Sequence, residues 1–197
     1  MPQQNDFSKG SIPRAILGLA APMTLAQLIN VLYNVVDRIY IGHLPDASTL
    51  ALTGLGLTLP VITIITAFAN LFGMGGAPLC SIARGQEDHS RAKRIMGNSF
   101  LALLLSGVVL TILCFALKEP VLYLFGASEQ TFQYADDYLG IYLLGTPFVM
   151  ISLGMNSFIN SQGFGKTGML TVLLGAVVNI ILDPVFIFLL DMGVKGA

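Results

Sequence analysis

Residues 95–117 read IMGNSFLALLLSGVVLTILCFAL, an unbroken run without a charged side chain. A helix needs about 20 apolar residues to cross the ~30 Å hydrocarbon core of a bilayer, so this run predicts a transmembrane helix. Four other stretches reach that length when single embedded acids are admitted. Because the runs are continuous and do not alternate over about ten residues, helices are favoured over a membrane barrel. The five helices are expected at residues 13–41, 50–80, 95–117, 129–162 and 169–190.

The composition of all 197 residues favours the same class of protein. Hydrophobic residues make up 54% of the chain and charged residues 11%, and the mean hydropathy is +0.76. A soluble domain usually carries about 25% charged residues, so a water-exposed globule is excluded. The net charge of −1 and the lack of a dense basic tract exclude a nucleic acid partner. The expected surroundings of the helices are therefore membrane lipid.

Basic residues are distributed unevenly over the two ends of the expected helices, which predicts an orientation. One side carries Lys9, Arg14, Arg84, Arg91, Lys93, Arg94 and Lys166, and the other carries Arg38, Lys118 and Lys195. Lys and Arg accumulate on the cytoplasmic side of membrane proteins, so seven against three places the N-terminus in the cytoplasm. We expect a multi-pass protein of the plasma membrane.

The segments near the helix ends give further expectations. The longest connection is expected within residues 118–137, where Ser128, followed by Glu129 and Gln130, is typical of a helix N-cap. The glycines of residues 73–76 fall inside an expected helix, so they predict close helix packing and not a nucleotide site. The two cysteines and two histidines are isolated, so apart from Na⁺ no metal site and no cofactor are expected.

Asp37 and Asp183 are the two acids within the expected membrane spans. An ionised carboxylate at that depth costs several kcal/mol unless it is paired, hydrated or protonated, so such residues predict function by default. A structural ion pair is the alternative, and Arg38 is its obvious partner. Neighbouring helical residues point about 100° apart, however, so Arg38 is poorly placed to pair with Asp37.

Polar side chains recur at helical spacing before each acid and on the fourth helix. The three stripes are Gln27, Asn30, Tyr33 or Asn34, and Asp37; Thr171, Gly175, Asn179 and Asp183; and Ser152, Asn156 and Asn160. Single amides in membrane helices usually bond neighbouring helices together, but stripes that end in acids favour a binding site. Carboxylate and amide oxygens suit a hard cation, and a desolvated carboxyl group can exchange a proton, so Na⁺ and H⁺ are both candidate ions.

These residues resemble the multidrug and toxic compound extrusion (MATE) family of transporters over the whole chain. The resemblance is carried by the NVVDRIYIGHL segment at residues 34–44, by residues 73–85 and, most strongly, by NIILDPVF at residues 179–186. It implies an all-α integral membrane fold in which residues 1–197 form five helices of a six-helix N-terminal lobe. The sixth helix and the C-terminal lobe would then lie outside this sequence.

The resemblance also implies roles for individual residues. Asp37 and Asp183 match the acids that bind the coupling ion or proton, with Asn179 and Asn156 as neighbouring oxygen ligands. The lobe cavity is expected to be lined by Asn30, Tyr33 and Tyr138, and by Gln27 of the same stripe. Pro22 matches a proline at which the first helix is thought to bend.

The function that the resemblance implies is antiport, with inward Na⁺ or H⁺ driving export of small organic, often cationic, compounds by alternating access. The partner would be a C-terminal lobe or a second half-transporter. A lipid-linked saccharide flippase of the same superfamily is an alternative, although the spans hold no deep basic residue that would favour it. An intramembrane aspartyl protease is disfavoured because its Tyr-Asp and Gly-x-Gly-Asp motifs are lacking, so no enzyme activity is expected.

Overall fold

The computed structural model describes residues 12–44 and 48–196, and over these ranges it is helical, without a strand. Five long helices follow one another along the chain, and all five are long and apolar enough to cross a membrane. They are α1 (Ile12–Gly42), α2 (Ser48–Gly85), α3 (His89–Leu124), α4 (Glu129–Ser161) and α5 (Gly165–Pro184). The predicted all-α membrane fold with five helices is thereby confirmed.

The prediction of a long connection between the third and fourth helices is wrong. α3 continues through Pro120 to Leu124, so residues 125–128 alone connect it to α4. Charged residues such as Lys118 end an apolar run without ending a helix, which explains the difference. Ser128 is the N-cap, as predicted, but its reciprocal partner in the capping box is the Thr131 side chain.

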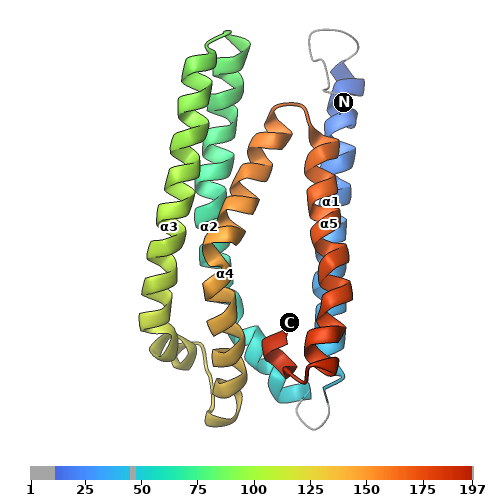
Figure 1. The fold of residues 1–197 in the computed structure, drawn as a ribbon, viewed down its shortest axis with the longest axis vertical. Helices are drawn as coiled ribbons and strands as arrows, with labels where there is room; N and C mark the ends of the chain where they lie inside the picture. Colours follow the sequence, from blue (N-terminus) through green and yellow to red (C-terminus); the bar gives the residue numbers. More distant parts are fainter. Residues whose placement is uncertain (1–11, 45–47, 197) are drawn as a thin grey trace.

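The five helices form two groups, which Figure 1 shows as a three-helix bundle beside a helix pair. α2, α3 and α4 pack against one another, and α1 packs along α5. The contacts between the groups, made by α1 with α2 and by α4 with α5, are much less extensive. The described helices thus form a firmly packed bundle and a more loosely attached pair.

The seam between α2 and α4 explains why the bundle is firm. Buried residues recur every three or four positions on both helices, which places them on one face of each. Gly73 and Gly154 meet at this seam, and a Cβ built on Gly73 would lie 2.7 Å from the Gly154 Cα atom. A Cβ on Gly76 would likewise meet Ser99 and Phe158, whereas one on Gly75 would meet nothing within 4 Å. The predicted close packing therefore involves Gly73 and Gly76.

The Gly73→Ala substitution is expected to destabilise the protein by about 1 kcal/mol, the low end of the range for overpacking, because one methyl group must push two backbones apart. The melting temperature of the purified protein in detergent measures this effect. Gly75→Ala is the matched control, since it adds the same methyl group to the same helix in open space. Equal melting temperatures for the two variants would contradict the packing role of Gly73.

The chain after α5 turns back over one end of the bundle. Pro184 lacks the N–H that a regular α-helix requires, and the next residues form a π-helical turn, η1 (Val185–Leu189), in which the Leu190 N–H donates to the Val185 carbonyl at 2.8 Å. A 3-10 turn, η2 (Gly193–Gly196), follows. The predicted helix to residue 190 is thus irregular at its end. Ile187 and Val194 of these turns pack with Ile41, Ala51 and Leu55.

Candidate functional site

Asp183 is the most deeply buried carboxylate of the described residues, with 4% of its surface exposed. Asn179 lies one turn before it on α5, and this i, i+4 spacing lets the Asn179 Nδ2 donate to Asp183 Oδ1 at 2.8 Å. The second oxygen, Asp183 Oδ2, and the side-chain oxygen of Asn179 are both buried without a hydrogen-bond partner. One face of α5 therefore presents two unpaired oxygen atoms.

Asp37 faces this pair from α1. Its side chain is half-buried, and its Oδ1 atom is likewise buried without a hydrogen-bond partner. The Asp37 and Asp183 carboxyl groups lie within electrostatic range of each other, because α1 packs along α5. Arg38 is exposed, and the ion pairs within 4 Å in the described part of the chain do not join it to Asp37. The structure thus brings three of the four predicted ion ligands together.

These oxygens define what the site can hold. Three buried acceptors without donors, two of them from carboxylates, are costly in a low-dielectric interior unless a cation or protons occupy them. Oxygen ligands of this kind fit a hard cation such as Na⁺, and they equally fit a proton on one carboxyl group. These three oxygen atoms are therefore suited to bind the Na⁺ ion or the proton predicted from the sequence.

A tyrosine of α4 lies near the Asp37 carboxylate. Tyr138 of α4 lies within electrostatic range of Asp37 and of Tyr33 on α1, and its ring stacks on that of Tyr142 with 6.3 Å between centroids. Tyr138 also packs against the cluster formed by Ile41, Ile187 and Val194. Tyr138 thus lies near Asp37 and Tyr33, and it packs against the cluster that contains Ile41 of α1.

Asn156, the fourth predicted ligand, lies elsewhere. Its Nδ2 donates to the Gly168 carbonyl at 3.0 Å and to Thr171 Oγ1 at 2.8 Å, and its Oδ1 accepts from Asn160 Nδ2 at 2.8 Å. Thr171 precedes Asn179 by eight residues, about 12 Å along a helix. The structure therefore does not bring Asn156 to the acids, and its side-chain oxygen is already engaged.

A cavity of about 570 Å³ lies beside this amide network, between α1, α2, α4 and α5. Its described polar lining is uncharged and consists of Gln27, Asn30, Asn70, Ser152, Asn156, Ser157, Asn160, Ser161 and Thr171. The predicted cavity residues are thus divided between two places. Gln27 and Asn30 line this cavity, whereas Tyr33 and Tyr138 lie near the acids. Pro22 is half-buried within α1, and its role as a bend stays a prediction.

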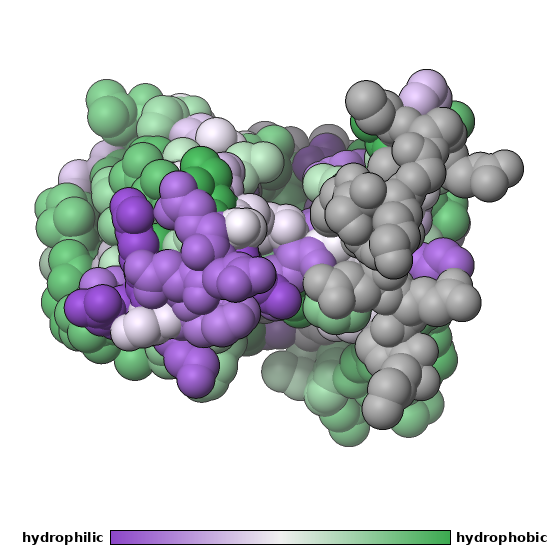
Figure 2. Space-filling view, turned by 90° about the horizontal axis from the view of Figure 1, so that it is seen from above, coloured by the Kyte–Doolittle hydropathy of each residue, from purple (hydrophilic) through white to green (hydrophobic). Residues whose placement is uncertain are grey.

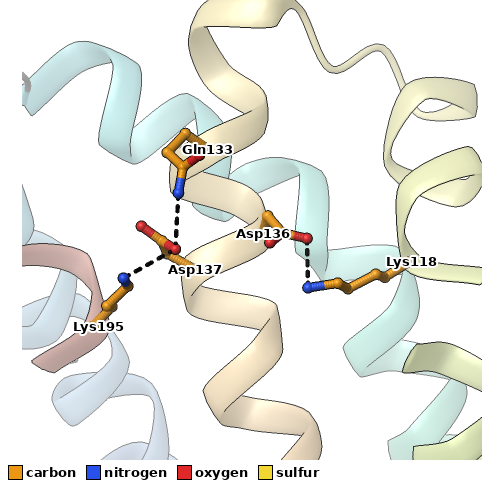
Figure 3. Close-up of polar contacts among 5 residues, drawn as sticks. All are labelled: Lys118, Gln133, Asp136, Asp137 and Lys195. Carbon is orange, nitrogen blue, oxygen red and sulfur yellow. Dashed lines mark hydrogen bonds and ion pairs between the residues drawn. The ribbon is translucent and has the colours of Figure 1, made fainter. Parts of the chain in front are cut away.

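Two ion pairs link α4 to neighbouring elements, as Figure 3 shows. Lys118 Nζ lies 2.7 Å from Asp136 Oδ1, which joins α3 to α4. On the other side of α4, Lys195 Nζ lies 3.3 Å from Asp137 Oδ1, to which Gln133 also donates at 3.0 Å. The second pair joins η2, which follows α5, to α4.

Sequence reasoning missed some of these residues. In the sequence, Asp136 and Asp137 are indistinguishable from solvent-exposed charges, because their partners Lys118 and Lys195 are distant along the chain. Asn70 is a single amide on α2 with no stripe to mark it. Asn160 stood in a stripe with Asn156, and that spacing was the signal of the network in which both take part.

Comparison with known proteins identifies similar molecules. The model of the family described as MatE matches residues 22–185. A relative named "Multidrug export protein MepA", from Staphylococcus haemolyticus, is 31% identical over 191 residues, which cover 97% of this chain and 42% of the relative.

Solved structures agree with this match. A multidrug resistance MATE family transporter of the MOP superfamily in an outward-facing conformation has 30% identity and a TM-score of 0.88, over 95% of this chain and 41% of that one. A MATE crystal structure in the bent conformation has 29% identity and a TM-score of 0.86, over the same shares. The chain thus spans about two fifths of the length of the proteins it matches.

Proposed function

We propose, from the premise that this chain belongs to the MatE family of membrane transporters, that it forms the ion-binding lobe of a cation-coupled multidrug exporter. Membership of this family and five membrane-spanning helices make it a multi-pass plasma membrane protein. The family is a class of transporters and not of enzymes. The coupling ion, the exported compound and the second lobe are parts of the proposal.

The observation that carries the proposal is the set of three unpaired oxygens on α1 and α5. Asp37 Oδ1, Asn179 Oδ1 and Asp183 Oδ2 are buried, and no side chain in the described part of the chain donates to them. Na⁺ or a proton would remove the cost of leaving these atoms unsatisfied. Asp37 and Asp183 would supply charge, and Asn179 would fix the orientation of the Asp183 carboxylate through its hydrogen bond.

Ion binding would act on the helix pair more than on the bundle. A cation or proton between Asp37 and Asp183 would draw α1 and α5 together. Tyr138 of α4 would interact electrostatically with Asp37, so its environment would change when the charge of Asp37 is neutralised. Because the pair contacts the bundle less extensively than the bundle helices contact one another, it can move with few losses of packing. The ion can bias two conformations only through its difference in affinity for them.

The cavity of about 570 Å³ suits an organic compound of moderate size. Its uncharged amide and hydroxyl lining would accept and donate hydrogen bonds to such a compound. No basic side chain lines it among the described residues, which disfavours the phosphate-bearing carrier of a lipid-linked saccharide flippase. A second lobe, or a second copy acting as a half-transporter, would complete the pathway.

Transport by the protein as its cell makes it, reconstituted in vesicles with a fluorescent organic cation, tests the proposal. We expect movement of the dye to follow an imposed Na⁺ or H⁺ gradient and to stop when that gradient is collapsed. Dye movement that is unaffected by collapse of both gradients would contradict the proposal. Co-purification of a second, different polypeptide that is required for transport would identify the partner as a separate chain.

A further inference from the structure

A second, smaller cavity lies at the opposite end of the bundle from the ion pairs of Figure 3. Its volume is about 350 Å³, and the proposed transport function does not use it. It is formed where α2 ends, α3 begins and α4 ends. The described lining residues are Cys80, Arg84, His89, Ala92, Lys93, Met96 and Gln162.

The charged side chains of this lining are all basic. Arg84 comes from α2, and His89 and Lys93 come from one face of α3, since they are four residues apart. The described lining includes no acid. Asp88 is adjacent in sequence, but its Oδ1 caps α3 by accepting from the Arg91 N–H at 2.9 Å. Glu87 is exposed and outside the lining.

The walls of the cavity are fixed by contacts between the helices. Arg84 is half-buried, and its Nη1 donates to Gln162 Oε1, which holds the guanidinium at the end of α4. Ser81 Oγ donates to the Ser161 carbonyl at 2.9 Å, and the buried Cys80 thiol contacts the Ala92 carbonyl at 3.7 Å. Arg84 is therefore held at the wall of the cavity, and His89 and Lys93 line the same cavity with exposed side chains.

The cavity lies where the apolar part of the bundle ends. Between Ser48 and Ala83 α2 carries no charged residue, and Arg84 is the first. Figure 2, which views this end, shows hydrophilic side chains gathered over the α2–α3 turn with hydrophobic side chains around them. This is the level at which lipid headgroups meet a membrane protein, and the sequence places it on the cytoplasmic side, where anionic lipids attract basic residues.

The geometry points to a phosphate-binding site in which Arg84, His89 and Lys93 receive the anionic phosphate of a lipid headgroup or of a soluble phosphate ester. A guanidinium can donate two hydrogen bonds to phosphate oxygens, and Lys93 adds a mobile charge. Met96, which lines the same cavity and has 39% of its surface exposed, offers an apolar contact for an acyl chain.

Binding to the protein as its cell makes it, purified in detergent, tests this site by native mass spectrometry. We expect phosphatidylglycerol to be retained about tenfold more tightly than phosphatidylcholine, and Lys93→Gln to lower the affinity for phosphatidylglycerol about fivefold. Arg94→Gln is the matched control because it removes an exposed charge next to Lys93 that does not line the cavity. His89→Gln and Arg84→Gln are measured in the same way, with melting temperatures to verify folding.

Competition by glycerol phosphate separates the two sources of phosphate. Displacement of phosphatidylglycerol by millimolar glycerol phosphate would support a site for soluble esters, and retention of the lipid would support a headgroup site that also uses acyl contacts. Equal retention of the two lipids would overturn the proposal. Equal losses for Lys93→Gln and Arg94→Gln would also overturn it, since the attraction would then belong to the surface as a whole. None of these outcomes depends on coupled transport.

Discussion

Asp183→Asn in the protein as its cell makes it is expected to lower ion-driven export about 100-fold, near the upper end of what coupling free energies between sites provide. Asparagine has the shape of the aspartate and keeps an oxygen that can accept from Asn179, so the local geometry should survive. The asparagine side chain is uncharged and is not a titratable group, so it can neither attract Na⁺ as a carboxylate does nor exchange H⁺. Initial rates of dye export under an imposed ion gradient measure the loss.

The melting temperature of the Asp183→Asn protein is expected to be unchanged or raised, because the substitution removes a buried charge without leaving a gap. Asp191→Asn is the matched control. Asp191 is exposed in the turn before η2 and has a positive φ of 52°, a conformation that asparagine also adopts readily. Undiminished ion-driven export by Asp183→Asn would remove Asp183 from the coupling site, and an equal loss in Asp191→Asn would show a general effect of charge.

Much of the fold is predictable from the sequence because lipid imposes simple requirements. Uncharged runs such as residues 95–117 must be helical where water is lacking, and the number of helices follows from them. The ends are less predictable. α3 extends past Lys118 because a helix can leave the membrane without ending. η1 is irregular because Pro184 has no backbone N–H to donate, and the hydrogen bonds that form instead depend on the turn that follows.

The candidate site is predictable where one helix carries the signal. Asn179 and Asp183 share a face of α5, so their hydrogen bond follows from spacing alone. The distribution of amides between two places does not follow from spacing, because it depends on which neighbour each face meets. Asn156 faces Gly168 and Thr171 across a short turn, whereas Asp37 faces Asp183 through the packing of α1 along α5. The Lys195–Asp137 pair depends on a chain reversal that no local pattern encodes.

The contacts of Asn156 lead to a second prediction, which separates a bridging amide from an ion ligand. Asn156→Leu is expected to destabilise the protein by about 1–3 kcal/mol, because cross-helix hydrogen bonds are lost and polar groups lose their partners. The affected groups are the Gly168 carbonyl, the Thr171 hydroxyl and the Asn160 amide. A lower melting temperature in detergent should accompany an unchanged dependence of the remaining export on ion concentration.

Asn98→Leu provides the control, since it makes the same change at an exposed position on α3 and should leave the melting temperature nearly unchanged. If Asn156 instead binds the ion, export by Asn156→Leu will require a higher ion concentration while the melting temperature stays close to that of the unmodified protein. That outcome would mean that the amide exchanges its bond with Asn160 for the ion during transport, since its oxygen accepts from Asn160 in this structure. The two measurements together therefore assign Asn156 either to the packing of α4 on α5 or to the ion site.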